Sequence, residues 1–301
     1  MLLSMNLETL LRKHGLEFAL DTYRKAGFDA VDYELCCMVK DNDRFNGDGY
    51  RVIAEEIRRA ADSRGLIINQ THAPFSFSKD LVADPVAYEE IVLPRLVRSL
   101  EISGIFGAKI CVIHPLQHLP YQGNEQVLFE MNMKHYRYLL PYAKEYGVKI
   151  GVENMWQRDP RRKCITASVC AFSEEFVRYI DTLDDPYAVA CLDVGHVGLP
   201  ANATEEPCDL VRALGHDRLQ ALHIHDNDYC GDQHWLPFMG KLNWTETMRA
   251  LGEIDYTGDF TFETSTALIS GFDVACVPIV ARYLSDIGRY LMGEIEKSRQ
   301  A

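Results

Sequence analysis

The sequence lacks paired cysteines, a long apolar run and an N-terminal targeting pattern. Its nine cysteines are scattered, odd in number and free of any CxxC spacing, which argues against a disulfide framework and favours reduced thiols. No apolar run approaches the roughly 20 residues of a membrane helix. The first residues show no basic segment followed by an apolar core. We therefore expect a cytoplasmic protein with no membrane partner.

The sequence also has few basic residues relative to acidic ones. Lysine and arginine total 31 against 44 aspartates and glutamates, so the net charge is −13. A duplex-binding protein normally carries a basic stripe that neutralises phosphates. The nearest equivalent, Arg158 to Lys163, is interrupted by Asp159 and Pro160, and we interpret it as a solvated loop. Nucleic acid is thus disfavoured as a partner.

Short apolar runs alternate with longer segments of helical periodicity along the whole chain. Eight strand–helix units without a linker predict a single domain over residues 1–301, with parallel strands closed into a (β/α)₈ TIM barrel. Its active site should lie at the C-terminal ends of the strands, where residues 154–170 and 226–243 form unusually long loops. The predicted strands cover residues 2–5, 29–34, 66–71, 109–114, 148–153, 188–193, 219–225 and 259–263.

Ionisable residues stand where the predicted strands five to eight end. Glu153, Asp193, His223 and Glu263 occupy these positions in order. In a closed barrel these side chains face a common axis. Burying an ionisable group without a partner costs on the order of several kcal/mol, and a bound cation would offset this cost. Mixed carboxylate and imidazole ligands suit Mn²⁺, Co²⁺, Zn²⁺ or, less well, Mg²⁺. The sequence therefore predicts a divalent cation at this end of the barrel.

Further metal-capable residues accompany this set. Taken singly, each is more typical of a helix cap or a hydrogen-bonded strand end. Together, six consecutive strands end in such a group, which favours a site. His225 either replaces His223 as a ligand or lies behind it. The candidates for further metal or substrate binding are His72, His114, His196, His225, Asp232 and His234.

A few other residues are candidates for the substrate pocket. Trp156, Trp235 and Phe238 lie in the long loops, where aromatic faces can cover a small ligand. Glu34 ends the second predicted strand and either contacts substrate hydroxyls or serves the turn.

The motifs THAP, IHP, GVEN, LDVGH, LHIHDND, DQH and FET, in this order, resemble the xylose isomerase-like TIM-barrel superfamily. The resemblance implies a sugar or sugar-phosphate isomerase or epimerase that transfers a proton through a cis-enediolate. It further implies one divalent metal ion held by Glu153, Asp193, His223 and Glu263. The two glutamates would also serve as acid/base groups, and His196 would contact a small sugar substrate. The sequence leaves open whether the chain forms a homo-oligomer.

One departure keeps alternatives open. An arginine that often follows the seventh-strand histidine in epimerase-like members is absent. Instead, Asp232 and His234 match the Asp-X-His of endonuclease IV, and the chain has counterparts of all nine ligands of that enzyme's three-metal site. This resemblance implies up to three metal ions and phosphodiester cleavage in DNA repair, against which the net charge stands. A sugar-acid or inosose dehydratase, or a non-catalytic metal-binding member, also remains open.

Overall fold

Eight parallel strands form the centre of the molecule. The computed structural model describes residues 1–75, 77–201, 203–264 and 271–300. All eight predicted strands are present, with ends shifted by two residues or fewer. In sheet order, starting from the last strand, they are β10 (Phe260–Phe262), β1 (Leu3–Asn6), β2 (Ala30–Glu34), β3 (Ile67–His72), β4 (Ile110–Ile113), β5 (Lys149–Glu153), β8 (Ala188–Asp193) and β9 (Leu219–His223).

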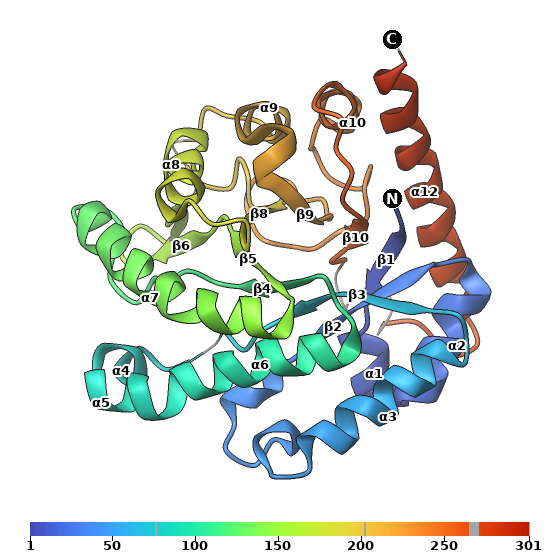
Figure 1. The fold of residues 1–301 in the computed structure, drawn as a ribbon. Helices are drawn as coiled ribbons and strands as arrows, with labels where there is room; N and C mark the ends of the chain where they lie inside the picture. Colours follow the sequence, from blue (N-terminus) through green and yellow to red (C-terminus); the bar gives the residue numbers. More distant parts are fainter. Residues whose placement is uncertain (76, 202, 265–270, 301) are drawn as a thin grey trace.

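The sheet closes between its first and last members. Ile224, just after β9, pairs in parallel with Phe262 of β10. The Ile224 amide donates to Thr261 O at 2.9 Å, and the Glu263 amide donates to Ile224 O at 3.1 Å. The strands therefore surround a common axis (Figure 1), and the predicted TIM barrel is confirmed.

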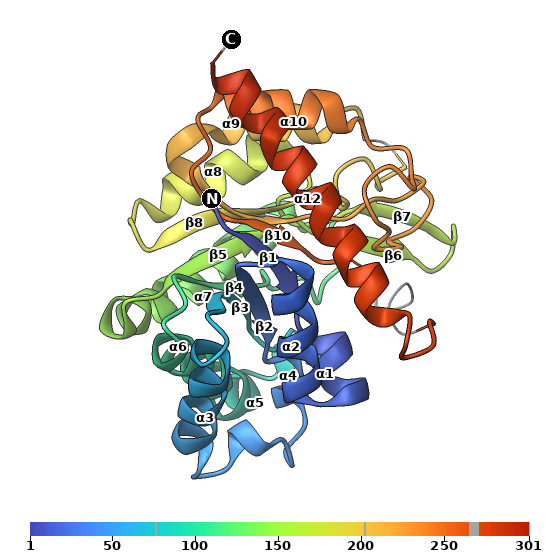
Figure 2. The same ribbon diagram turned by 90° about the vertical axis from the view of Figure 1, so that its right-hand side faces the viewer.

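Helices form a ring outside the strands, and each packs against the next (Figures 1 and 2). Figure 2 shows α12 crossing the outside of the barrel beside β1, between α2 and α10. Gly27, Gly107 and Gly147 end α2, α6 and α7 in the left-handed conformation that glycine adopts without strain. The ring consists of α2 (Leu16–Ala26), α3 (Tyr50–Asp62), α6 (Leu93–Phe106), α7 (Glu125–Tyr146), α8 (Ser173–Leu183), α9 (Pro207–Arg218), α10 (Trp244–Glu253) and α12 (Val277–Arg299).

Several short helical segments lie in the connections. None of the helices in the described part of the chain is long and apolar enough to cross a membrane. The short segments are α1 (Glu8–His14), η1 (Cys36–Val39), η2 (Arg44–Asn46), α4 (Lys79–Ala83), α5 (Pro85–Ala87) and the π-helical η3 (Tyr88–Val92).

A small apolar cluster lies below the ends of β4, β8 and β9. Val112, Cys191 and Ala221 are its buried members, and Ile110 packs against them. Side chains alternate along a strand, so Cys191 shares a face with Asp193, and Ala221 shares one with His223. Asp193 and His223 therefore stand above apolar side chains of their own strands.

The two long loops differ in structure. The segment 154–170, predicted as a loop, contains an antiparallel hairpin of β6 (Trp156–Asp159) and β7 (Cys164–Ala167). The segment 226–243 is held instead by one side chain, Asp226. Its carboxylate accepts four backbone N–H groups and the Trp244 indole N–H at 2.8–3.2 Å; the amides belong to Asn227, Phe238, Gly240 and Leu242.

Candidate metal centre

The structure brings together the four residues predicted to hold a metal. One oxygen or nitrogen atom of each of Glu153, Asp193, His223 and Glu263 lies within 4.8 Å of the others. His223 Nδ1 stands between the two glutamates, 3.1 Å from Glu153 Oε1 and 3.2 Å from Glu263 Oε2. Glu153, Asp193 and His223 are at most 1% exposed. We call this set the central cluster.

The central cluster concentrates negative charge in a buried place. Burial alone raises the pKa of Glu153, but the adjacent His223 and His114 outweigh it and hold this pKa well below its usual value. Burial raises the pKa of Glu263 to about 7, although His223 and His234 oppose the rise. For Asp193, contacts with His196 and His225 overcome burial and lower the pKa to about 2. The carboxylates thus depend on nearby imidazoles for compensation.

This donor set fits a divalent cation. Metal–oxygen and metal–nitrogen bonds of about 2.0–2.2 Å place neighbouring donors roughly 3.0–3.5 Å apart. The contacts of His223 Nδ1 with the two glutamates fall in that range, and Asp193 Oδ2 lies farther away, at 4.0 Å. Three carboxylates and one imidazole are also the donors that Mn²⁺, Co²⁺ and Zn²⁺ accept. The residues present therefore fit the predicted ion.

A second group of possible ligands adjoins Glu153 on one side. His114 Nε2 lies 2.9 Å and His72 Nε2 lies 3.4 Å from Glu153 Oε2. Burial lowers the pKa of His114 to about 4, whereas the contact with Glu153 outweighs burial for His72 and raises its pKa to about 9. Both side chains therefore share one carboxylate with the central cluster.

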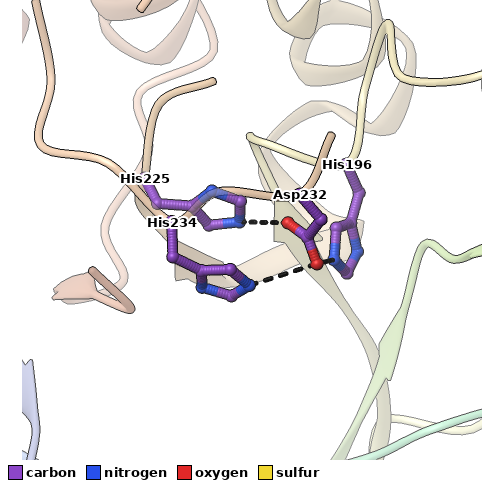
Figure 3. Close-up of side chains that lie close together, drawn as sticks. All are labelled: His196, His225, Asp232 and His234. Carbon is purple, nitrogen blue, oxygen red and sulfur yellow. Dashed lines mark ion pairs between the residues drawn. The ribbon is translucent and has the colours of Figure 1, made fainter. Parts of the chain in front are cut away.

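A third group lies on the other side, beyond Asp193. Figure 3 shows Asp232 between His196, His225 and His234. Asp232 Oδ2 lies 3.5 Å from His196 Nε2 and 3.2 Å from His234 Nε2, and Asp232 Oδ1 lies 3.8 Å from His225 Nε2. His225 Nε2 also lies 2.9 Å from Asp193 Oδ1, and its ring stacks on His234 with centroids 3.9 Å apart. His225 thus belongs to this third group, while His223 belongs to the central cluster.

Two residues that position the metal-capable side chains were not predicted from the sequence. Asp32 on β2 lies 3.6 Å from His223 Nε2 and accepts a hydrogen bond from Gln70. An acidic residue inside the apolar run AVDYE was the signal for it. Asn154 fixes the end of β8. Its side-chain amide donates to the Asp193 carbonyl and accepts from the Asp193 N–H, and its backbone carbonyl oxygen lies 2.8 Å from His196 Nδ1.

A cavity of about 1580 Å³ opens above the three groups. Trp156 lines it and donates its indole N–H to Asp232 Oδ2 at 3.2 Å. The basic stretch interpreted as a solvated loop covers the end of β6 and the exposed turn before β7, and Arg158, Arg161 and Arg162 are among the residues that line the cavity. The volume exceeds the roughly 300–1,000 Å³ typical of small-ligand pockets.

Three predicted pocket residues do not line this cavity, although one of them, Glu34, pairs with His72 between β2 and β3. Among the described residues, those lining the cavity do not include Trp235, Phe238 or Glu34. The Trp235 backbone pairs with Asp226. Phe238 is 56% exposed and packs near Trp244 and Tyr290, because the bonds to Asp226 turn its loop outward. Glu34 accepts a hydrogen bond from Asn6 at the end of β1.

The fold and the centre together define a class: a (β/α)₈ barrel with metal-capable residues at the C-terminal ends of its strands. Residues 20–274 match the family described as xylose isomerase-like TIM barrel, and the chain belongs to that family.

Individual proteins agree with this assignment. The uncharacterised protein y4fM of Sinorhizobium fredii is 24% identical over 275 residues, which are 83% of this chain and 81% of that protein. The structure of a D-psicose 3-epimerase in the presence of D-fructose has a TM-score of 0.73 and 16% identity, and covers 97% of this chain and 100% of that one. The structure of an IolI protein with a bound zinc atom has a TM-score of 0.69 and 16% identity, and covers 98% of each chain.

Proposed function

We propose that this protein is a metal-dependent isomerase or epimerase of sugars or sugar phosphates. In this proposal Glu153, Asp193, His223 and Glu263 hold one divalent cation. The observation that carries it is the convergence of these four side chains, from four strands, within 4.8 Å. The fold shared with a sugar epimerase and with a zinc-bound protein supports the same direction.

When bound, the cation would supply Lewis acidity to the carbonyl and hydroxyl oxygens of the substrate. The protein's own residues then move the proton. Glu153 and Glu263 flank His223, so one carboxylate can take the proton from the carbon next to the carbonyl while the other returns it. Return to the opposite face of the same carbon gives an epimer, and return to the adjacent carbon gives an isomer.

Other residues orient these groups. His196 lines the cavity and is held by the Asn154 carbonyl, which suits it to contact a substrate hydroxyl. The Phe75 ring has its centroid 4.9 Å from that of His72 and 4.6 Å from that of His114, and Trp156 also lines the cavity. These aromatic faces would exclude water from the reacting carbon.

Two measurements on one preparation test the proposal. Metal-free protein is reloaded with Mn²⁺, Co²⁺, Zn²⁺ or Mg²⁺ and its metal content is determined after desalting. It is then incubated in D₂O with D-fructose, D-psicose and D-tagatose, the sugars named for related structures, and with their phosphates. We expect one tightly held ion at the central cluster, counted as the metal that the wild type retains and Asp193→Asn does not, and deuterium at the carbon next to the carbonyl. An ion retained without exchange into any of these sugars would indicate a non-catalytic member.

A second candidate, metal-dependent phosphodiester cleavage, has one specific observation in its favour. The second and third groups place His72, His114, His196, His225, Asp232 and His234 around the central cluster. Three tightly bound ions per chain, with cleavage of DNA at an abasic site, would favour it over the sugar isomerase.

A further inference from the structure

A separate cluster of possible ligands lies at the same end of the barrel, after β1 and β2. Glu8, the first residue of α1, meets Cys36 and Cys37, the first residues of η1. One ligand atom from each lies within 4.8 Å of the others. These residues are not among those that line the cavity in the described part of the chain. We call this set the thiol cluster.

The atoms of the thiol cluster are spaced as ligands of one ion would be. Both thiol groups point at the same carboxylate oxygen, with Cys36 Sγ and Cys37 Sγ each 3.8 Å from Glu8 Oε1. In a tetrahedral zinc site with Zn–S of about 2.3 Å and Zn–O of about 2.0 Å, sulfur and oxygen stand roughly 3.5 Å apart. The observed separations exceed this by only a few tenths of an ångström.

Glu34 lies beside the thiol cluster, although it is not among the residues whose ligand atoms all lie within 4.8 Å of one another. Glu34 Oε2 lies 3.5 Å from Cys36 Sγ. Its other oxygen accepts a hydrogen bond from the Asn6 side chain, and Asn6 also accepts one from the Glu8 amide at 3.1 Å. Asn6 therefore fixes both glutamates relative to each other, so the site is built into the ends of β1 and β2.

The charge of the thiol cluster also calls for a cation. Glu8 is only 7% exposed, and a second carboxylate, that of Glu34, contacts the Cys36 thiol. The one basic side chain that an ion pair joins to Glu8 among the described residues is Arg12, at 3.5 Å, and it is 66% exposed. Paired carboxylates beside two thiols form a site that prefers a soft or borderline divalent ion over Mg²⁺ or Ca²⁺.

We propose that Glu8, Cys36 and Cys37 form a second metal site that binds Zn²⁺ independently of the central cluster, with Glu34 beside Cys36. Thiolates and carboxylates are both ligands that Zn²⁺ accepts. The ion would tie α1 to η1 beside the barrel mouth.

Cadmium is a probe that separates this site from the central cluster. Cd²⁺ bound by thiolates gives an ultraviolet charge-transfer band, and the central cluster contains no sulfur. Metal-free, reduced protein is titrated with Cd²⁺ while this band is recorded, and Zn²⁺ is then added in competition. We expect a band that saturates at one thiolate-bound ion per chain and that Zn²⁺ abolishes.

Variants show which cysteines give rise to the charge-transfer band. Cys36→Ser with Cys37→Ser should remove it, whereas Cys230→Ser, at an exposed cysteine outside the cluster, should leave it unchanged. Glu8→Gln keeps both thiols and replaces the test if the double variant does not fold. It should weaken Cd²⁺ binding by more than the roughly 10–100-fold that is typical when a residue behind a ligand is changed. Asp193→Asn should leave the band intact.

Two results would overturn the proposal. One is a wild-type protein that shows no band after full reduction. The other is a band that persists when both cysteines are replaced, because the thiolates would then lie elsewhere. Neither result tests the ion at the central cluster. That ion is measured separately, as the metal retained by the double variant Cys36→Ser, Cys37→Ser.

Discussion

At the scale of the residue, each side chain of the centre is set by a few specific neighbours. Glu153 contacts His223 through one oxygen and His114 through the other. It therefore joins the central cluster to the second group of possible ligands. A change at this residue removes a charge from both, which makes it the most informative single position.

Replacing Glu153 by glutamine should abolish proton exchange. The amide is close to isosteric but carries no charge and cannot act as a base, so the exchange rate should fall by about 10²–10⁴-fold. The retained metal should fall as well. Deuterium incorporation and metal content are the measurements, with Glu130→Gln on the exposed face of α7 as the matched control. Exchange at the wild-type rate would rule out Glu153 as the base.

Gly195 in the LDVGH motif is required for space. An added Cβ would stand 1.9 Å from Cε1 of the His225 ring. This ring is buried, contacts Asp193 and stacks on His234, so it has no room to retreat. Gly195→Ala should therefore displace His225 and destabilise the protein by about 1–3 kcal/mol.

Urea unfolding measures that loss. Gly49→Ala is the matched control, because a Cβ there meets nothing within 4 Å. Equal stability of the two variants would contradict the steric argument.

At the scale of the element, single polar residues organise whole segments. Asp226 holds the loop between β9 and α10, and Tyr88 of η3 binds His135 of α7 with 2.5 Å between the hydroxyl oxygen and Nδ1. Such contacts fix segments that have few apolar anchors of their own.

Asp226→Asn should loosen the loop that carries Asp232 and His234. An amide nitrogen would replace one carboxylate oxygen and face N–H donors, leaving at least one buried donor unpaired, at a cost of about 2–4 kcal/mol. Limited proteolysis within 226–243 and hydrogen exchange measure the effect. Asp228→Asn is the control, because this side chain bonds only within the exposed turn of the same loop. Unchanged protection in Asp226→Asn would contradict the role of its carboxylate.

His135 should make the protein sensitive to acid. Burial lowers its pKa to about 3, against about 6.5 in the unfolded chain. Because the folded pKa is the lower one, the contribution of His135 to stability is full above about pH 6.5 and is lost as the pH falls toward 3. At pH 5 the loss amounts to about 2 kcal/mol.

The test compares unfolding free energies at pH 7 and pH 5. His135→Gln, which stays neutral, should lose about 2 kcal/mol less between these values than the wild type. His216→Gln on the surface should behave as the wild type does. An equal drop in His135→Gln would mean that other groups cause the acid sensitivity.

At the scale of the whole molecule, barrel closure and the metal centre depend on one another. The central cluster draws on β5, β8, β9 and β10, so an ion bound there links strands far apart in sequence. The link between β9 and β10 rests on few backbone bonds around Ile224. Metal binding should therefore stabilise the complete barrel.

Removing the metal should lower the melting temperature. An ion at 100 times its dissociation constant stabilises the folded state by about 2.7 kcal/mol, which for a chain of this length corresponds to roughly 4 °C. Calorimetry with and without chelator gives the shift, and readdition of the ion should restore it. Asp193→Asn should show a smaller shift, and a shift equal to that of the wild type would place the stabilising ion elsewhere.

Much of this architecture could be predicted from the chain alone. Parallel strands buried on both faces read as short apolar runs, which is why all eight were found. Glu153, Asp193, His223 and Glu263 were recognisable because each follows such a run directly. Asp32 was missed because it lies inside a run, and the β6–β7 hairpin was missed because its four-residue strands have little periodicity.

The sequence by itself determined the strands, their order along the chain and the polar residues at their ends, because these follow from local apolar patterning. Only the tertiary structure decided which of those residues meet. His223 joins the central cluster and His225 joins Asp232, while Glu8 lies beside cysteines that follow it by 28 and 29 positions. Such pairings depend on barrel closure and strand register, which bring side chains within a few ångströms irrespective of their separation in the sequence.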